Sequence, residues 1–159
     1  MKKIILIGRS ESGKTTLTQA LKGEKIQYHK TQYTNHYDVI IDTPGEYIQT
    51  KNLGAALAMY TFEADVVGLL VSATEPYSLF PPCITPLANR PVIGIITKIN
   101  DNGADIKQAE KWLRIAGCEN IFYVDSLTGE GVFKIFEYLK EDSDVLPWEI
   151  KGVDYNGTE

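Results

Sequence analysis

Residues 8–15 contain a glycine-rich pattern that restricts the fold more than any other part of the sequence. They read Gly-Arg-Ser-Glu-Ser-Gly-Lys-Thr, which is a complete G-x-x-x-x-G-K-[ST] pattern. An apolar run at residues 3–7 precedes it, and a helix-forming stretch at residues 15–22 follows it. Glycines at the turn positions let successive backbone N–H groups curl around phosphate groups without steric cost. The pattern therefore predicts a strand, a phosphate-binding loop and a helix, with a nucleoside triphosphate as the ligand.

Side chains of the same segment supply the other groups that a bound triphosphate needs. Lys14 places a point charge near the outer phosphates, so it is also the first candidate for a catalytic residue. Thr15 offers a hydroxyl to Mg²⁺, Thr16 lies within reach of the α-phosphate, and the helix start adds the positive end of its dipole. We therefore predict that ATP or GTP binds with Mg²⁺ to a continuous segment of nine residues: Gly8, Arg9, Ser10, Glu11, Ser12, Gly13, Lys14, Thr15 and Thr16.

The composition and net charge of the chain limit the partners and the cellular location that we expect. Its 159 residues are 43% hydrophobic, which fits one domain, and the net charge of −5 comes without a basic block. We therefore expect neither a nucleic acid nor a membrane as a partner. Cys83 and Cys118 are isolated thiols, and the chain starts directly with a short strand rather than a signal segment. A cytoplasmic location is the expectation.

Apolar runs rich in β-branched residues alternate with stretches of helical periodicity. The runs are typical of parallel strands buried on both faces, and they lie at residues 3–7, 37–41, 66–72, 92–97 and 120–124. The helical stretches lie at residues 15–22, 53–63, 106–116 and 132–140. This alternation predicts an α/β fold, a three-layer α/β/α sandwich with a mostly parallel sheet.

Three further segments complete the predicted organisation. Residues 26–33 form a weaker, polar strand candidate that we expect as an antiparallel edge beside residues 37–41. Residues 75–91 contain five prolines, which leave room for at most a turn or two of helix. The acidic, Pro- and Gly-containing end is predicted to be loosely held. We therefore expect a nucleotide-binding domain at residues 1–142 and a tail at residues 143–159.

In open α/β sheets ligands bind beyond the carboxyl ends of the strands, and the run Asp42-Thr43-Pro44-Gly45 follows one predicted strand end. Asp42 is predicted to hold Mg²⁺ through water, and the N–H of Gly45 is predicted to meet the γ-phosphate. Glu46 comes next and is the second candidate catalytic residue. Its alternative interpretation is a solvated residue of a loop. A carboxylate here accepts a hydrogen bond from water but brings negative charge to a negative centre, so we do not expect fast hydrolysis.

Two more strand ends carry candidate base-binding residues. The segment at residues 97–101 resembles the [NT]-K-x-D guanine-reading motif of small GTPases, with Asn100 where that motif has a carboxylate. Its candidate base-binding residues are Thr97, Lys98, Asn100 and Asp101. An amide offers one acceptor and a donor, which leaves the choice between ATP and GTP open, and Asp101 is the alternative carboxylate. On this argument Asn100→Asp is expected to raise the preference for GTP severalfold. Ser126 and Leu127 belong to a segment, residues 125–131, that looks like the S-A-x-x-G-x-G segment that supports the base, although Thr128 as a helix cap is an alternative.

These motifs occur in the order found in Ras-like GTPases and cover nearly the whole chain. The compact form, with GRSESGKTT, DTPGEY, Lys30-Thr31-Gln32 before a tyrosine-rich stretch and a proline-rich replacement of one helix, resembles the EutP/PduV family. The resemblance implies a P-loop nucleotide-binding protein of ethanolamine or propanediol utilisation in bacteria with protein-shelled microcompartments. Members of the ethanolamine branch, which the short N-terminus favours here, have been credited with acetate kinase activity using ATP.

The resemblance is compatible with two functions. One is an ATP- or GTP-dependent phosphotransferase acting on acetate, which needs no general base because acetate is ionised at neutral pH. The other is a nucleotide-gated switch that recruits a partner, such as a microcompartment shell protein, through residues 28–35 and 46–52. A degenerate scaffold without nucleotide affinity is a third reading. Candidate cations for acetate are Arg9, His29, Lys30 and Lys51, and Thr31 is preferred over Thr34 as a further Mg²⁺ ligand.

Overall fold

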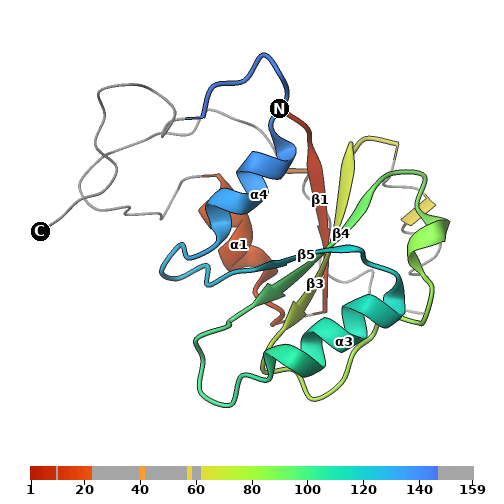
Figure 1. The fold of residues 1–159 in the computed structure, drawn as a ribbon, viewed down its shortest axis with the longest axis vertical. Helices are drawn as coiled ribbons and strands as arrows, with labels where there is room; N and C mark the ends of the chain where they lie inside the picture. Colours follow the sequence, from red (N-terminus) through yellow and green to blue (C-terminus); the bar gives the residue numbers. More distant parts are fainter. Residues whose placement is uncertain (10, 23–39, 42–56, 59–61, 147–159) are drawn as a thin grey trace, which may run out of the picture.

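The computed structural model describes residues 1–9, 11–22, 40–41, 57–58 and 62–146, which are coloured in Figure 1. Five strands form one sheet in the order β2-β1-β3-β4-β5, and every neighbouring pair is parallel. The strands are β1 (Ile4–Ile7), β2 (Ile40–Ile41), β3 (Val66–Ser72), β4 (Val92–Thr97) and β5 (Asn120–Tyr123). The helices are α1 (Lys14–Leu21), the 3₁₀ turn η1 (Thr85–Leu87), α3 (Ile106–Ala116) and α4 (Val132–Leu139).

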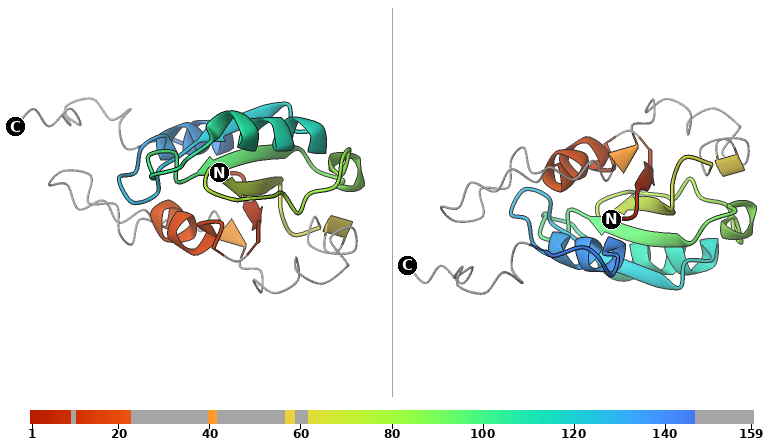
Figure 2. Two further views of the ribbon diagram at one scale, coloured as in Figure 1. Left: turned by 90° about the horizontal axis from the view of Figure 1, so that it is seen from below. Right: turned by 90° about the horizontal axis from the view of Figure 1, so that it is seen from above.

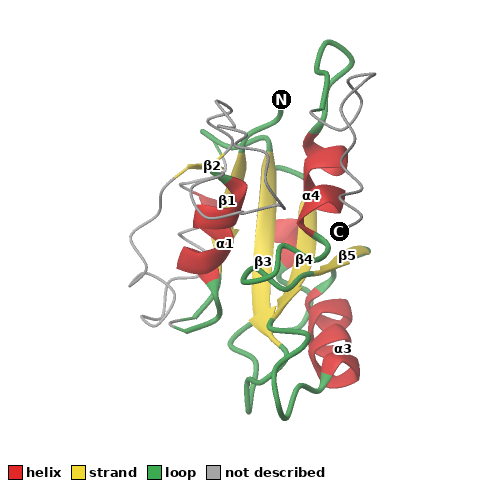
Figure 3. Cartoon of the chain, turned by 90° about the vertical axis from the view of Figure 1, so that its left-hand side faces the viewer, coloured by secondary structure: helices red, strands yellow, loops and turns green. Residues whose placement is uncertain are grey.

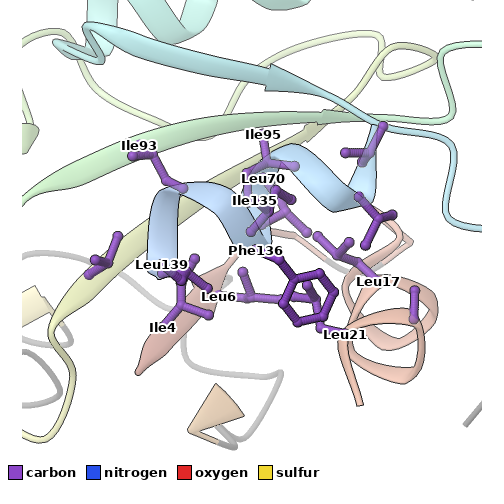
Figure 4. Close-up of a cluster of buried hydrophobic side chains, with 14 of the residues drawn as sticks. Ile4, Leu6, Leu17, Leu21, Leu70, Ile93, Ile95, Ile135, Phe136 and Leu139 are labelled. Atoms are coloured by element: carbon purple, nitrogen blue, oxygen red, sulfur yellow. The ribbon is translucent and has the colours of Figure 1, made fainter. Parts of the chain in front are cut away.

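Helices cover both faces of the sheet, because alternate residues of the buried strands face opposite sides. Helices α1 and α3 lie on opposite sides of the strands, as Figures 2 and 3 show. On one face, side chains of β1, β3 and β4 pack against α1 and α4 (Figure 4): Ile4, Leu6, Leu70, Ile93, Ile95, Leu17, Leu21, Ile135, Phe136 and Leu139. On the other face, Ile5, Leu69 and Ile96 pack with Leu113 and Ala116 of α3. The predicted α/β sandwich with three layers is confirmed.

Local signals explain where the helices begin and end. Helix α3 starts after Asp105, whose side chain accepts a hydrogen bond from the Gln108 N–H at 3.0 Å, as an N-cap residue does. It ends at Gly117, which adopts the left-handed conformation (φ 111°). Helices α1 and α4 instead begin after Gly13 and Gly131, without a side-chain cap. The predicted alternative of Thr128 as a cap of α4 is therefore wrong.

The predicted strands at residues 66–72 and 92–97 and the helix at residues 106–116 agree with β3, β4 and α3 at both ends. The predicted antiparallel edge at residues 26–33 lies outside the described residues, as does most of the run at residues 37–41. Within the predicted helix at residues 53–63, Leu57 and Ala58 are helical, whereas Phe62 and Glu63 lie in a turn, so the predicted end was too late. Strand β5 is not buried on both faces as expected, because it lies at the edge of the sheet.

The proline-rich segment contains η1, so the prediction of at most a turn or two of helix is confirmed. The expected tail at residues 143–159 needs a correction at its start. The Asp144 carboxylate lies 2.8 Å from the Met1 amine, and Leu146 is buried in the core beside α4. This ion pair raises the pKa of the Met1 amine and lowers the pKa of the Asp144 carboxyl. The packed domain thus extends to residue 146, and residues 147–159 lie outside the described residues.

A search of the described helices found none with the length and apolar character needed to cross a membrane.

Candidate functional site

The segment between β1 and α1 turns back on itself, as the predicted phosphate-binding loop requires. The Ser12 N–H donates to the Arg9 carbonyl at 3.1 Å, and Gly13 adopts a left-handed conformation with φ 89°. Helix α1 begins at the next residue, Lys14, and no side chain of the described residues caps its first turn. The first N–H groups of a helix have no partner within the helix, so they remain available to an anion.

Both glycines of the loop are needed for steric reasons. A Cβ at Gly8 would lie 2.5 Å from Ser12 Oγ and 2.9 Å from Leu70 Cβ, closer than real contacts allow. A Cβ at Gly13 would lie 3.1 Å from Thr97 Oγ1, in addition to the cost of the positive φ. The pattern of the sequence thus reflects the packing of this loop against β3 and β4.

The loop contains a buried hydroxyl whose hydrogen-bonding capacity is unused. Ser12 is fully buried, and its Oγ has no hydrogen-bond partner among the described residues. The Oγ of Ser126, in the loop after β5, is also buried and has no hydrogen-bond partner among the described residues. A buried polar atom without a partner costs about 1–3 kcal/mol, and a phosphate or base group would remove that cost. The described residues therefore fit a bound nucleotide.

Thr97 and Lys98, at the end of β4, hold the loop in place. Thr97 Oγ1 donates to the Ser12 carbonyl, and Lys98 Nζ donates to the Glu11 carbonyl at 2.8 Å. Thr97 is buried, and in this structure its hydroxyl is used to hold the main chain of the loop. The ammonium group of Lys98 is likewise tied to the loop, which leaves its aliphatic stem to cover a base. Direct contacts of these two residues with a nucleotide stay predictions.

Asn100 links two loops through its amide group. Its Nδ2 donates to Asp125 Oδ2 at 3.0 Å and to Glu130 Oε2 at 2.7 Å. Asp125 also accepts the N–H groups of Leu127 at 3.0 Å and Thr128 at 3.4 Å through Oδ1. The amide at position 100 therefore donates to two carboxylates, and a carboxylate at the same position would repel both of them.

The turn after β5 brings Glu130 to this position. The Asp125 N–H donates to the Glu130 carbonyl at 2.9 Å, and the Gly129 N–H donates to the Asp125 carbonyl at 2.8 Å. A Cβ at Gly131 (φ 78°) would overlap the Tyr123 carbonyl oxygen. Asp125 and Glu130 were not among the site residues predicted from the sequence. The signal was present, because Asp125 directly precedes Ser126 at the end of a strand that lies beside β4.

The remaining described candidates around the base side are exposed. Asp101 closes a turn through its N–H, which donates to the Lys98 carbonyl at 3.1 Å, and its side chain faces solvent. Leu127 is 83% exposed, so its N–H rather than its side chain takes part in the loop. Ser126 and Leu127 directly follow Asp125, one of the two Asn100 partners, and their contact with a base stays a prediction.

Arg9 of the phosphate loop packs on an aromatic ring that the sequence analysis did not single out. Its guanidinium carbon lies 4.5 Å from the centre of the Tyr77 ring. Nearby, burial raises the pKa of Glu75, although its Oε1 accepts the Ser72 N–H at 3.1 Å and the charges of Arg9 and Lys98 oppose the shift. The segment after β3 thus places one ring and one carboxyl next to the loop.

Several predicted site residues lie outside the described residues. These are Ser10, Thr31, Asp42, Gly45 and Glu46, together with the acetate candidates His29, Lys30 and Lys51. Of the predicted Mg²⁺ ligands, only Thr15 is described, and it is exposed at the start of α1. Within the described part of the chain, no group of three or more His, Cys, Asp or Glu side chains is arranged to hold a metal ion.

Several known proteins are similar to this chain in sequence. Propanediol utilization protein PduV of Citrobacter freundii is 42% identical over 146 residues, covering 90% of this chain and 97% of that protein. Probable acetate kinase EutP of Escherichia coli (strain K12) is 31% identical, covering 87% and 89%. GTPase Era of Corynebacterium glutamicum is 27% identical over 91% of this chain, which spans about half (54%) of that protein.

The identities bear on the expected branch and on the family. The value is higher for the propanediol protein than for the ethanolamine protein, which does not support our preference for the ethanolamine branch. The similarity to Era agrees with the P-loop NTPase fold predicted from the motifs. A family model described as ethanolamine utilisation and propanediol utilisation matches residues 1–141. The chain therefore belongs to the PduV-EutP family.

Proposed function

We propose that this chain is a nucleotide-binding phosphotransferase of ethanolamine or propanediol utilisation that moves the γ-phosphoryl group of ATP or GTP to acetate. The formed phosphate loop carries the proposal. It combines the uncapped start of α1 with the buried, unpartnered Ser12 hydroxyl. Both features favour a polyanionic ligand at this end of the sheet.

The reaction we propose requires positioning and charge neutralisation rather than a base. An acetate oxygen attacks the γ-phosphorus, and the bond between that phosphorus and the β,γ-bridging oxygen breaks with its electron pair passing to the nucleoside diphosphate. Lys14 and the loop N–H groups stabilise the negative charge on the phosphates. Thr15, with Asp42 and Thr31 from segments outside the described residues, would hold Mg²⁺, which supplies further charge neutralisation when bound.

For holding acetate we propose Arg9, which is the one of the four candidate cations that lies within the described residues. It is in the phosphate loop, and its guanidinium carbon lies over the Tyr77 ring, 4.5 Å from the ring centre. A guanidinium has five N–H donors, and those that do not face the ring can pair with a carboxylate. The printed name of the E. coli relative, probable acetate kinase EutP, supports acetate as the acceptor.

The similarity to Era GTPases favours a second function, a nucleotide-gated switch with a partner such as a microcompartment shell protein. In that case nucleotide binding reorders the segments at residues 28–35 and 46–52, and phosphoryl transfer is slow or does not occur. For both functions we propose a cytoplasmic protein, associated with a microcompartment.

Reverse-direction turnover separates the two functions. Purified protein is incubated with Mg²⁺, acetyl phosphate and ADP or GDP, and the nucleoside triphosphate formed is measured. We expect turnover in the unaltered protein, none with Lys14→Ala, and full turnover with Lys111→Ala, a matched control on the exposed surface of α3. Nucleotide binding without turnover would favour the switch, and failure to bind any triphosphate would indicate a degenerate scaffold.

The acetate site has its own test. Arg9→Leu is expected to raise the KM for acetyl phosphate about tenfold or more, because a charge-assisted pair is lost, while nucleotide affinity changes less. Arg90→Leu, at an exposed position before β4, is the control for the lost charge. An unchanged KM for acetyl phosphate in Arg9→Leu would remove Arg9 from the proposal.

A further inference from the structure

This inference rests on the proposed nucleotide-binding function and concerns which base the site accepts. We propose that Glu130 and Asn100 together read the base, with two hydrogen-bond acceptors side by side, so that the site selects guanine over adenine. Glu130 thereby takes the role of the carboxylate that is not found at position 100.

The amide of Asn100 has a forced orientation. Both of its Nδ2 contacts are carboxylate oxygens, at 3.0 Å on Asp125 and 2.7 Å on Glu130. A carboxylate accepts hydrogen bonds and repels another acceptor, so the NH₂ group must face the two acids. With both N–H bonds used there, Asn100 offers a ligand only its Oδ1, which is an acceptor.

The two acids differ in what they have left to offer. Asp125 is buried, and its oxygens are used by the Leu127 and Thr128 N–H groups and by Asn100. Glu130 is exposed, and one of its oxygens, Oε2, receives Asn100. Asp125 is therefore a positioning residue, whereas Glu130 presents a charged acceptor next to Asn100 Oδ1.

The location of this pair fits the base end of a nucleotide. Asn100 is two residues after Lys98, whose Nζ is tied to the phosphate loop at Glu11. Asn100 is therefore close in the chain to a residue that contacts the loop that would hold the phosphates. In the residue after Asp125, the buried Oγ of Ser126 has no hydrogen-bond partner among the described residues, which is a second indication that a polar ligand belongs here.

Base chemistry then decides the selectivity. The edge of guanine carries two adjacent donors, N1–H and the N2 amino group, which match two acceptors. Adenine offers the donor N6 beside the acceptor N1, and that acceptor would face an acceptor of the protein. Inosine keeps N1–H but has no amino group at C2, so it can satisfy only one of the two acceptors.

Competition binding with GTP, ITP and ATP tests the proposal on the full-length protein. The unaltered protein is expected to bind GTP about tenfold more tightly than ITP, and ATP more weakly than GTP. Equal affinities for GTP and ITP would overturn the proposal without any variant. Binding of no triphosphate at all would contradict the proposed function itself, which keeps the two failures distinct.

Glu130→Gln provides the second arm. Its amide keeps one acceptor for Asn100 and turns a donor toward the base, which suits adenine. GTP affinity should fall about tenfold, while ATP affinity should stay the same or rise. Glu137→Gln, on the exposed surface of α4, removes the same charge and should leave the GTP-to-ATP ratio unchanged. A parallel loss of GTP and ATP affinity in Glu130→Gln would mean a purely structural role and overturn the proposal, as would a ratio that responds to Asp101→Asn instead.

Discussion

The phosphate side and the base side of this site are built in different ways. On the phosphate side, the groups that we propose for anion binding come from one continuous segment of the sequence, residues 8–15, through its main chain and the start of α1. On the base side, Asn100 contacts Asp125 and Glu130, which are 25 and 30 residues further along the chain. The first part depends on backbone conformation, and the second depends on side chains that meet only in the folded protein.

This difference predicts how amino-acid substitutions in each part of the site affect nucleotide binding. A backbone cradle depends on its glycines, because they allow the main-chain conformation that presents its N–H groups, and a change at a glycine affects every ligand that the cradle binds. A side-chain network can be altered one residue at a time, with effects on selectivity rather than on binding as a whole. Three substitutions test this contrast.

Gly13→Ala should have the largest effect. The left-handed backbone at Gly13 (φ 89°) costs about 1–2 kcal/mol for an alanine, and the new Cβ would press on Thr97 Oγ1 at 3.1 Å. We expect all triphosphates to bind about a hundredfold more weakly, with no change in base preference, measured by titration calorimetry.

Gly103→Ala is the matched control for that experiment. Gly103 also has a positive φ, 78°, but a Cβ there would have nothing within 4 Å among its surroundings. It should lose about 1–2 kcal/mol of stability to unfolding and keep its nucleotide affinity within about twofold. If Gly103→Ala weakened nucleotide binding as much as Gly13→Ala, the effect would not be specific to the phosphate loop. The proposed difference between the two sides of the site would then be contradicted.

Asn100→Asp should have an intermediate effect, opposite to the one that the motif alone suggests. The substitution removes the donor of two hydrogen bonds and places three carboxylates together. GTP affinity is therefore expected to fall about tenfold, measured by competition with ATP, instead of rising.

The double variant Asn100→Asp with Asp125→Asn tests whether the loss of affinity comes from the lost hydrogen bonds and the carboxylate repulsion. It restores one amide–carboxylate pair between the two positions, so part of the lost GTP affinity should return, as a double-mutant cycle would register. A single Asn100→Asp variant with raised GTP preference would contradict this view and support the original motif argument.

Thr97→Val should have the smallest effect. The hydroxyl that holds the Ser12 carbonyl is lost while shape is nearly kept, at a cost of about 0.5–1.5 kcal/mol. GTP and ATP affinities are expected to fall together by a few fold, so that their ratio is unchanged in competition measurements. A change in the ratio would show that Thr97 acts on the base side as well.

Much of the fold followed from the sequence because its signals are local. Strands β3 and β4 and helix α3 were predicted to the residue, since continuous β-branched runs and a 3.6-residue apolar period are strong patterns. The end of the predicted helix at residues 53–63 and the start of the tail were less well predicted. Leu146 illustrates why: its burial beside α4 depends on residues far from it in the chain.

The sequence by itself determined the order of the elements and the phosphate loop, because glycine spacing and backbone turns depend on neighbouring residues alone. Only the tertiary structure decided what surrounds Asn100. The parallel pairing of β4 with β5 brings the loops after these strands together, and the turn before α4 carries Glu130 to within 2.7 Å of the amide. No local pattern encodes such a meeting, because it depends on how two strands lie side by side.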